Sequence, residues 1–137
     1  MQQGDSVQNT VVVLVVEDDQ LVQGLVKDAL EHGGFEAEIT SSGEDAVRLL
    51  QDNVRKYRAL ITDVNLLGEL TGWEVGHSAR ELNPDIPVIY MTGAAADEWS
   101  ANGVPKSILL NKPFAPAQIV AAVAQLLNEG SISPGRN

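Results

Sequence analysis

The stretch Val11-Val-Val-Leu-Val-Val-Glu-Asp-Asp19 decides the fold, because a run of apolar residues leads directly into three carboxylates. An unbroken β-branched run is typical of a strand that is buried on both faces of a parallel sheet. The apolar residues that come next recur at helical spacing: Val22, Leu25, Val26, Ala29 and Leu30. Asp18 or Asp19 stands where a helix cap belongs and Gly33-Gly34 supplies the stop, so the sequence predicts a strand followed by a helix.

The same alternation of strand and helix recurs along the rest of the chain. Four more strands are expected, at Phe35–Thr40, Ala59–Asp63, Pro87–Met91 and Ser107–Leu110. A helix is expected to begin at a capping box formed by Ser41–Glu44, and another to cover Trp73–Leu82. A weaker helix is expected over Ala94–Gly103, and the last helix begins near Pro116. This alternation of five strands and five helices predicts right-handed crossovers and a doubly wound α/β fold around a parallel five-stranded sheet.

The composition is that of one acidic domain. The 137 residues include 19 Asp or Glu, 9 Lys or Arg and no Cys, with a formal net charge of −10. The missing cysteine excludes disulfides and thiolate metal sites, and the negative charge argues against binding to phosphate backbones. The longest apolar run, Val11–Val16, is too short to span a membrane, and the start lacks the features of a signal peptide. We therefore expect a cytoplasmic protein with no direct nucleic-acid or membrane partner.

Chemically capable side chains follow four of the five expected strands. They are Glu17, Asp18 and Asp19 after the first, Asp63 at the end of the third, Thr92 after the fourth and Lys112 after the fifth. Ligands of such sheets bind outside the carboxyl ends of the strands, where the strand order reverses. Glu17, Asp18 and Asp63 offer the oxygen ligands that Mg²⁺ prefers, and a carboxylate can act as a nucleophile towards phosphorus. Lysine and hydroxyl groups suit the stabilisation of phosphoryl oxygens.

Each of these residues also has a structural explanation. Asp18 or Asp19 alone fits a helix cap, Thr92 fits a cap for the Ala-rich helix, and Lys112 fits a surface charge. Asp63 is harder to explain in this way, because an unpaired carboxylate that ends an apolar strand is costly to bury. The joint occurrence of these residue types at one edge of a sheet therefore favours a phosphoryl-transfer site.

Four segments together resemble the receiver domain of two-component response regulators, the CheY-like family: Leu14–Asp19, Ile61–Asn65, Val88–Gly93 and Asn111–Phe114. The resemblance covers about residues 10–128 and implies the flavodoxin-like strand order 2-1-3-4-5. We expect a receiver domain over residues 11–128, a disordered N-terminal tail over 1–10 and a flexible C-terminal tail or linker stub over 129–137. The resemblance implies a signalling switch rather than an enzyme that acts on outside substrates.

The resemblance also implies roles for the acidic residues. Asp63 matches the phosphoacceptor, which receives a phosphoryl group from a histidine kinase or a histidine phosphotransfer protein. Glu17 and Asp18 match the acidic pair that holds Mg²⁺ together with Asp63, and the backbone carbonyl of Asn65 matches a further metal ligand. Asp19, one position past the pair, is expected to cap the first helix.

Three residues on the other side of the expected pocket match the family as well. Thr92 matches the hydroxyl that turns towards the bound phosphoryl group, and Gly93 matches the small residue that keeps the pocket open. Lys112 matches the lysine that pairs with the phosphoryl oxygens, and its bond to Pro113 is expected to be cis. The resemblance places the output at the face formed by residues 94–103, the strand at 107–110 and the last helix, which would meet an unknown downstream protein.

Three features depart from the family pattern. Leu109 stands where many receivers carry an aromatic residue that changes rotamer on phosphorylation. The loop Leu66–Gly72 is expected to be one residue longer than usual, and the helix over Ala94–Gly103 to be trimmed. Trp99 in this helix could anchor the core or meet a partner. These features leave open a pseudo-receiver that binds proteins without switching, and a small Mg²⁺-dependent phosphohydrolase is a weaker alternative.

Overall fold

The computed structural model describes residues 10–131 of the chain. One parallel sheet has the order β2-β1-β3-β4-β5 and is made of β1 (Val12–Val16), β2 (Glu36–Thr40), β3 (Ala59–Asp63), β4 (Val88–Thr92) and β5 (Ile108–Asn111). The helices are α2 (Gln20–His32), α3 (Gly43–Asn53), α4 (Gly72–Leu82), α5 (Trp99–Asn102) and α6 (Pro116–Ser131), and the 3-10 turns are η1 (Val54–Lys56) and η2 (Ala96–Glu98). The predicted doubly wound α/β fold and its strand order are confirmed.

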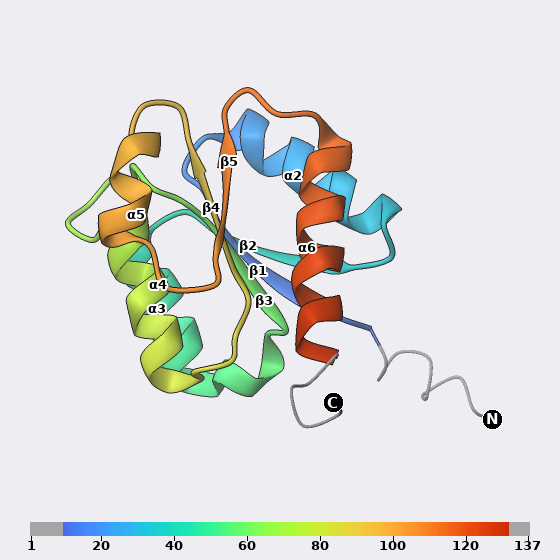
Figure 1. Ribbon diagram of the computed structural model, residues 1–137, viewed down its shortest axis with the longest axis horizontal. Coiled ribbons are helices and arrows are strands. Elements are labelled where there is room, and N and C mark those ends of the chain that lie inside the picture. Colours follow the sequence, from blue (N-terminus) through green and yellow to red (C-terminus); the bar gives the residue numbers. More distant parts are fainter. Residues whose placement is uncertain (1–9, 132–137) are drawn as a thin grey trace.

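Helices cover both faces of the sheet, with α2 and α6 on one side and α3, α4 and α5 on the other (Figure 1). Successive side chains of a strand point to opposite faces, so each strand contributes to two cores. In β1, Val13 and Val15 pack in the α2/α6 core, whereas Leu14 and Val16 pack in the core under α3 and α4. The unbroken apolar run of this strand therefore follows from burial on both faces.

The strand register brings the chemically capable residues to one edge. Val16 pairs with Thr62 across β1 and β3, and Thr92 pairs with Asn111 across β4 and β5. Because the strands are parallel, their carboxyl ends lie level with one another. The residues just beyond these pairs are consequently neighbours in space although they are far apart in the sequence.

The start of α2 is capped by Asp19, as the sequence predicts. The Asp19 carboxylate accepts hydrogen bonds from the backbone N–H groups of Leu21 and Val22, at 2.9 Å and 3.3 Å. These bonds satisfy donors that the first turn of a helix leaves without partners. The Asp19 carboxylate therefore caps the helix, and Glu17 and Asp18 are the acidic residues after β1 that can contribute to a site at the edge of the sheet.

The predicted capping box at Ser41–Glu44 is wrong. The cap of α3 is Ser42, whose hydroxyl accepts the Asp45 N–H at 3.1 Å. A capping box needs its acidic residue three positions after the cap, and this position belongs to Asp45, whose carboxylate pairs with Arg48. The Glu44 carboxylate reaches instead to the loop between β3 and α4.

In the last part of the chain, one expectation agrees with the structure and one boundary differs. The fourth crossover has only the turn η2 and the four residues of α5, so the trimmed helix that the sequence predicts is confirmed. Helix α6 continues to Ser131, past the expected end of the domain at residue 128. The rest of the expected tails, residues 1–9 and 132–137, lies outside the described residues. Within residues 10–131, no helix is both long and apolar enough to cross a membrane.

Candidate functional site

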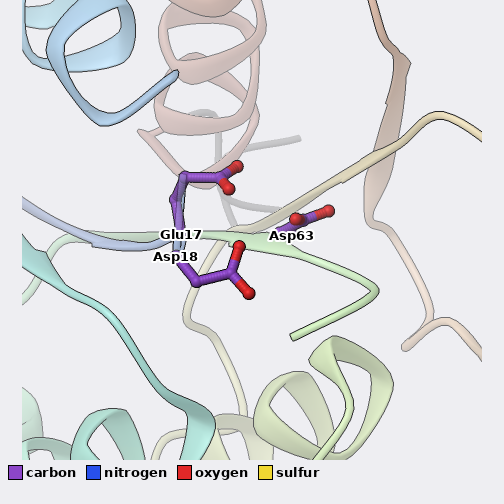
Figure 2. A group of neighbouring side chains, drawn as sticks. All are labelled: Glu17, Asp18 and Asp63. Atoms are coloured by element: carbon purple, nitrogen blue, oxygen red, sulfur yellow. The ribbon is translucent and has the colours of Figure 1, made fainter. Parts of the chain in front are cut away.

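Three carboxylates converge at the carboxyl end of the sheet. Glu17 and Asp18 follow β1 and Asp63 ends β3, and one oxygen from each lies within 4.8 Å of the others (Figure 2). Glu17 is fully buried, Asp63 is 6% exposed and Asp18 is half-buried. A cluster of carboxylate oxygens at this spacing has the donor chemistry of a site for a hard divalent cation.

Lys112 bridges two of these carboxylates from the end of β5. Its Nζ lies 3.0 Å from Oε1 of Glu17 and 3.1 Å from Oδ2 of Asp63. The Lys112 N–H also donates to the carbonyl of Thr92 at 2.8 Å, which ties the residue to β4. The peptide bond between Lys112 and Pro113 is cis, as the resemblance implies.

The charges in this cluster do not balance, because three carboxylates face one ammonium group. Burial raises the pKa of Asp63, and the charge of Lys112 opposes this shift. Burial also raises the pKa of Glu17, against the hydrogen bonds from the Asp19 N–H and from Lys112. Burial lowers the pKa of Lys112, but its hydrogen bond to Glu17 and the charge of Asp63 outweigh burial and leave the pKa raised. A second cation at the cluster would relieve the excess negative charge.

Backbone N–H groups hold one oxygen of each of the two acidic residues after β1. Oε2 of Glu17 accepts the N–H of Asp19 at 3.0 Å. Oδ2 of Asp18 accepts the N–H of Leu67 at 3.0 Å, from the loop that connects β3 with α4. Both side chains are therefore oriented by the fold itself, and Asp18 is linked directly to that loop.

The close approach of α4 to the end of β3 depends on a glycine. A Cβ at Gly72, the first residue of α4, would collide with the carbonyl oxygen of Asp63. The Gly72 N–H donates to the carbonyl of Val64 at 2.8 Å, which closes the loop between the two elements. The helix can therefore begin directly beside Asp63 because residue 72 lacks a side chain.

Thr92 is fully buried at the end of β4, but its hydroxyl does not contact Asp63 in any hydrogen bond of the described residues. Its Oγ1 accepts the N–H groups of Ala94 and Ala95, at 3.2 Å and 2.8 Å. The structural explanation for Thr92, a cap for the Ala-rich segment, is thus present in the fold. Gly93 is exposed, and a Cβ there would lie 3.8 Å from Cβ of Lys112.

The structure brings together Glu17, Asp18, Asp63 and Lys112, and it places Thr92 and Asn65 at the same edge. Asn65 is exposed in the loop after β3, and its backbone N–H lowers the pKa of Asp63. A contact that the sequence did not indicate is that of Glu44, whose carboxylate accepts N–H groups from the same loop. No local spacing pattern could have revealed it, since the partners are more than twenty positions apart.

Comparison with solved structures agrees with this fold. The response regulator receiver protein of Sinorhizobium medicae superposes with a TM-score of 0.85 and 37% sequence identity, over 88% of this chain and 97% of that one. The receiver domain of the sensor histidine kinase PA1611 of Pseudomonas aeruginosa, which has a magnesium ion coordinated in its active-site cleft, gives a TM-score of 0.74. It is 23% identical and covers 87% of this chain and 98% of its own. At that identity the likeness shows the fold alone.

Sequence comparison gives the same family. The response regulator SaeR of Staphylococcus aureus is 26% identical over 117 residues, which are 84% of this chain and 50% of SaeR. The chain therefore spans about half the length of the curated relatives it matches. The family model of the response regulator receiver domain matches residues 13–124. Because this match covers most of the chain, the protein belongs to the response regulator receiver domain family of two-component systems.

Proposed function

We propose that this receiver domain is a phosphorylation switch whose acceptor is Asp63. The observation that carries the proposal is the position of Lys112, whose Nζ pairs with Oδ2 of Asp63 and with Oε1 of Glu17. A lysine held between two buried carboxylates supplies positive charge where phosphoryl oxygens would arrive. The backbone of β1, β3 and β5 fixes all three groups, so little reorganisation accompanies the reaction.

The transfer needs few protein groups. A carboxylate oxygen of Asp63 attacks phosphorus, and the bond from phosphorus to the imidazole nitrogen of a donor phosphohistidine breaks, leaving its electron pair on that nitrogen. Lys112 then donates its hydrogen bond to a phosphoryl oxygen instead of to the free carboxylate. Positioning and charge neutralisation account for most of the catalysis in such reactions. The donor would be a histidine kinase or a histidine phosphotransfer protein, the usual partners of receiver domains.

The acidic cluster fits Mg²⁺. The carboxylates of Glu17, Asp18 and Asp63 would hold the ion together with the backbone carbonyl of Asn65, and the surplus of negative charge favours its binding. A bound ion would supply positive charge beside the phosphoryl oxygens. The magnesium ion in the receiver domain of PA1611 supports this assignment.

Thr92 would connect phosphorylation to the surface. Its hydroxyl now accepts the N–H groups of Ala94 and Ala95, and turning towards a phosphoryl oxygen would release both. Ala95 is buried and directly precedes η2 and α5, so its release would shift that segment together with β5 and α6. This face is the proposed contact for a downstream protein. The phosphoryl group would act by shifting the population of the domain between two conformations.

The alternative is a pseudo-receiver that binds proteins without switching. Leu109 favours it, since a half-buried leucine cannot make the rotamer change of an aromatic residue at that position. The two functions differ in their response to beryllofluoride, a phosphoryl mimic, in the presence of Mg²⁺. A switch shifts the amide resonances of residues 92–112, whereas a pseudo-receiver leaves them in place.

The direct test of the proposed function is intact-mass analysis after incubation with acetyl phosphate and Mg²⁺. The wild-type chain should gain one phosphoryl group, and Asp63→Ala should gain none. Asp45→Ala, which removes an exposed acid of α3, is the matched control and should react as the wild type does. Equal phosphorylation of Asp63→Ala would refute the proposal.

A further inference from the structure

The loop from Val64 to Thr71, between β3 and α4, is tied down at two points. At its base the N–H of Gly72 donates to the carbonyl of Val64 at 2.8 Å. Near its middle the N–H of Leu67 donates to Oδ2 of Asp18 at 3.0 Å. The residues between these two ties include Asn65, whose backbone carbonyl is a proposed metal ligand. The conformation of the loop therefore bears directly on the acidic cluster.

A third tie comes from another element. Oε2 of Glu44, in the first turn of α3, accepts the N–H of Glu69 at 2.9 Å and the N–H of Leu70 at 3.3 Å. Two donors on one carboxylate oxygen make charge-assisted hydrogen bonds, which are stronger than neutral ones. The bond from Glu69, the larger cause, and the bond from Leu70 lower the pKa of Glu44. Both bonds therefore favour the ionised carboxylate at neutral pH.

Two glycines let the loop lie against α3. Gly68 has a positive φ of 99°, and a Cβ there would come within 2.9 Å of Oε1 of Glu44. On the other side, a Cβ at Gly43 would come within 2.9 Å of Cβ of Leu70. Contact at both glycines shows that the backbone of the loop passes directly over the first turn of α3. The Glu44 contact is thus part of a close fit, not a single side chain reaching across solvent.

We propose that Glu44 is a positioning residue for the metal and phosphoryl site, acting through residues 65–70 of this loop. The inference rests on the proposed function and extends it to a residue outside the acidic cluster. With the Glu44 bonds in place, the loop is held at Leu67 by Asp18 and at Glu69 and Leu70 by α3. Without them this segment loses its ties to α3 and keeps those at its base and at Asp18. A metal ligand that must be ordered on binding lowers the affinity for the ion.

The test compares Glu44→Ala and Glu44→Gln with Asp45→Ala. Asp45 is the matched control, because it lies in the same helical turn and its carboxylate pairs with Arg48 on the exposed surface. The readouts are the Kd for Mg²⁺ from calorimetry, the exchange rates of the Glu69 and Leu70 amides, and the lifetime of the phosphorylated state. Neither the Kd for Mg²⁺ nor the amide exchange rates depend on phosphorylation.

Glu44→Ala should weaken Mg²⁺ binding by about tenfold and speed the exchange of both amides. Glu44→Gln should lie between Glu44→Ala and the wild type, because its amide oxygen still accepts hydrogen bonds but carries no charge. Asp45→Ala should match the wild type in all three measurements. This ordering distinguishes positioning by the carboxylate from a general loss of charge.

A Kd for Mg²⁺ that is the same in Glu44→Ala and Asp45→Ala would overturn the inference, even if the two amides exchange faster. That result is distinct from failure of the proposed function, which would appear as a wild-type chain that accepts no phosphoryl group from acetyl phosphate. A wild-type chain that binds no Mg²⁺ would contradict both.

Discussion

Nζ of Lys112 lies 3.1 Å from Oδ2 of Asp63, although the two residues are 49 positions apart in the chain. The contact joins the ends of β3 and β5, which are separated in the sheet by β4. It places the one ammonium group of the cluster between Asp63 and the fully buried carboxylate of Glu17. The stability and the ion binding of the domain should therefore depend on how this cluster is neutralised.

Mg²⁺ should stabilise the fold. An ion that binds only the folded protein adds about 1.4 kcal/mol to the free energy of unfolding at ten times its Kd, which raises Tm by a few degrees. Asp18→Asn should abolish most of this rise, because Asp18 is one of the three clustered carboxylates. Asp28→Asn, at an exposed position of α2, should retain it. The measurement is the Tm of each protein with and without millimolar Mg²⁺. A wild-type Tm that does not change with Mg²⁺ would contradict the metal site.

The Mg²⁺-free protein should gain stability from the cluster as the pH falls. Burial raises the folded-state pKa of Asp63 and of Glu17 above the ordinary values of 3.8 and 4.5. A carboxyl with a raised pKa contributes stability that is fully present below its ordinary pKa and is lost as the pH rises through its folded value. Unfolding free energies measured from about pH 4 to pH 8 should show this loss in the wild type, and a smaller loss in Asp63→Asn. Identical pH profiles for the two proteins would mean that burial does not raise the pKa of Asp63.

Thr92→Ala should cost stability before any phosphoryl group is involved. The substitution leaves the N–H groups of Ala94 and Ala95 without the oxygen that both now contact, at a cost of about 1 kcal/mol. Thr92→Ser keeps the hydroxyl and should keep most of the stability. In the switch test with beryllofluoride, Thr92→Ser should still shift the resonances of residues 94–107 and Thr92→Ala should not. A full response from Thr92→Ala would remove Thr92 from the proposed output.

Gly72→Ala should be one of the most damaging small substitutions in the chain. Its methyl group would collide with the carbonyl of Asp63, which belongs to the backbone and cannot turn away, so about 3 kcal/mol of stability should be lost. Gly24→Ala is the control, because a Cβ at this exposed position of α2 meets no atom within 4 Å. There the loss of glycine flexibility should stabilise the helix by roughly 0.5–1 kcal/mol. Chemical denaturation measures both, and a mild effect at Gly72 would contradict the close approach of α4.

The parts of the fold that depend on periodicity could be predicted from the sequence. The apolar run of β1 indicates burial on both faces, and its residues do divide between the two cores. The periodicity places the cap of the first helix at Asp18 or Asp19, and the resemblance to receivers favours Asp19, which is the residue that caps α2. Because parallel strands end level with one another, the sequence predicts that Glu17, Asp63 and Lys112 lie near one another.

Contacts that depend on loop conformation could not be predicted in the same way. The spacing of Ser41 and Glu44 predicts a capping box, but the partners of Glu44 are the N–H groups of Glu69 and Leu70. The capping box that does form joins Thr71 and Glu74, at the spacing such boxes require, after a loop that has no regular period. Loop backbone follows no repeating pattern, so its hydrogen-bond partners emerge only when the whole chain is folded.

The assignment of Asp63 as the acceptor is tested by locating the phosphoryl group itself. After incubation with acetyl phosphate and Mg²⁺, borohydride reduces an aspartyl-phosphate to an alcohol, and peptide mapping by mass spectrometry identifies the reduced side chain. We expect reduction at Asp63 alone, and none when Mg²⁺ is removed by a chelator. Reduction at another carboxylate, or a phosphoryl group on His32 or His77, would contradict this assignment.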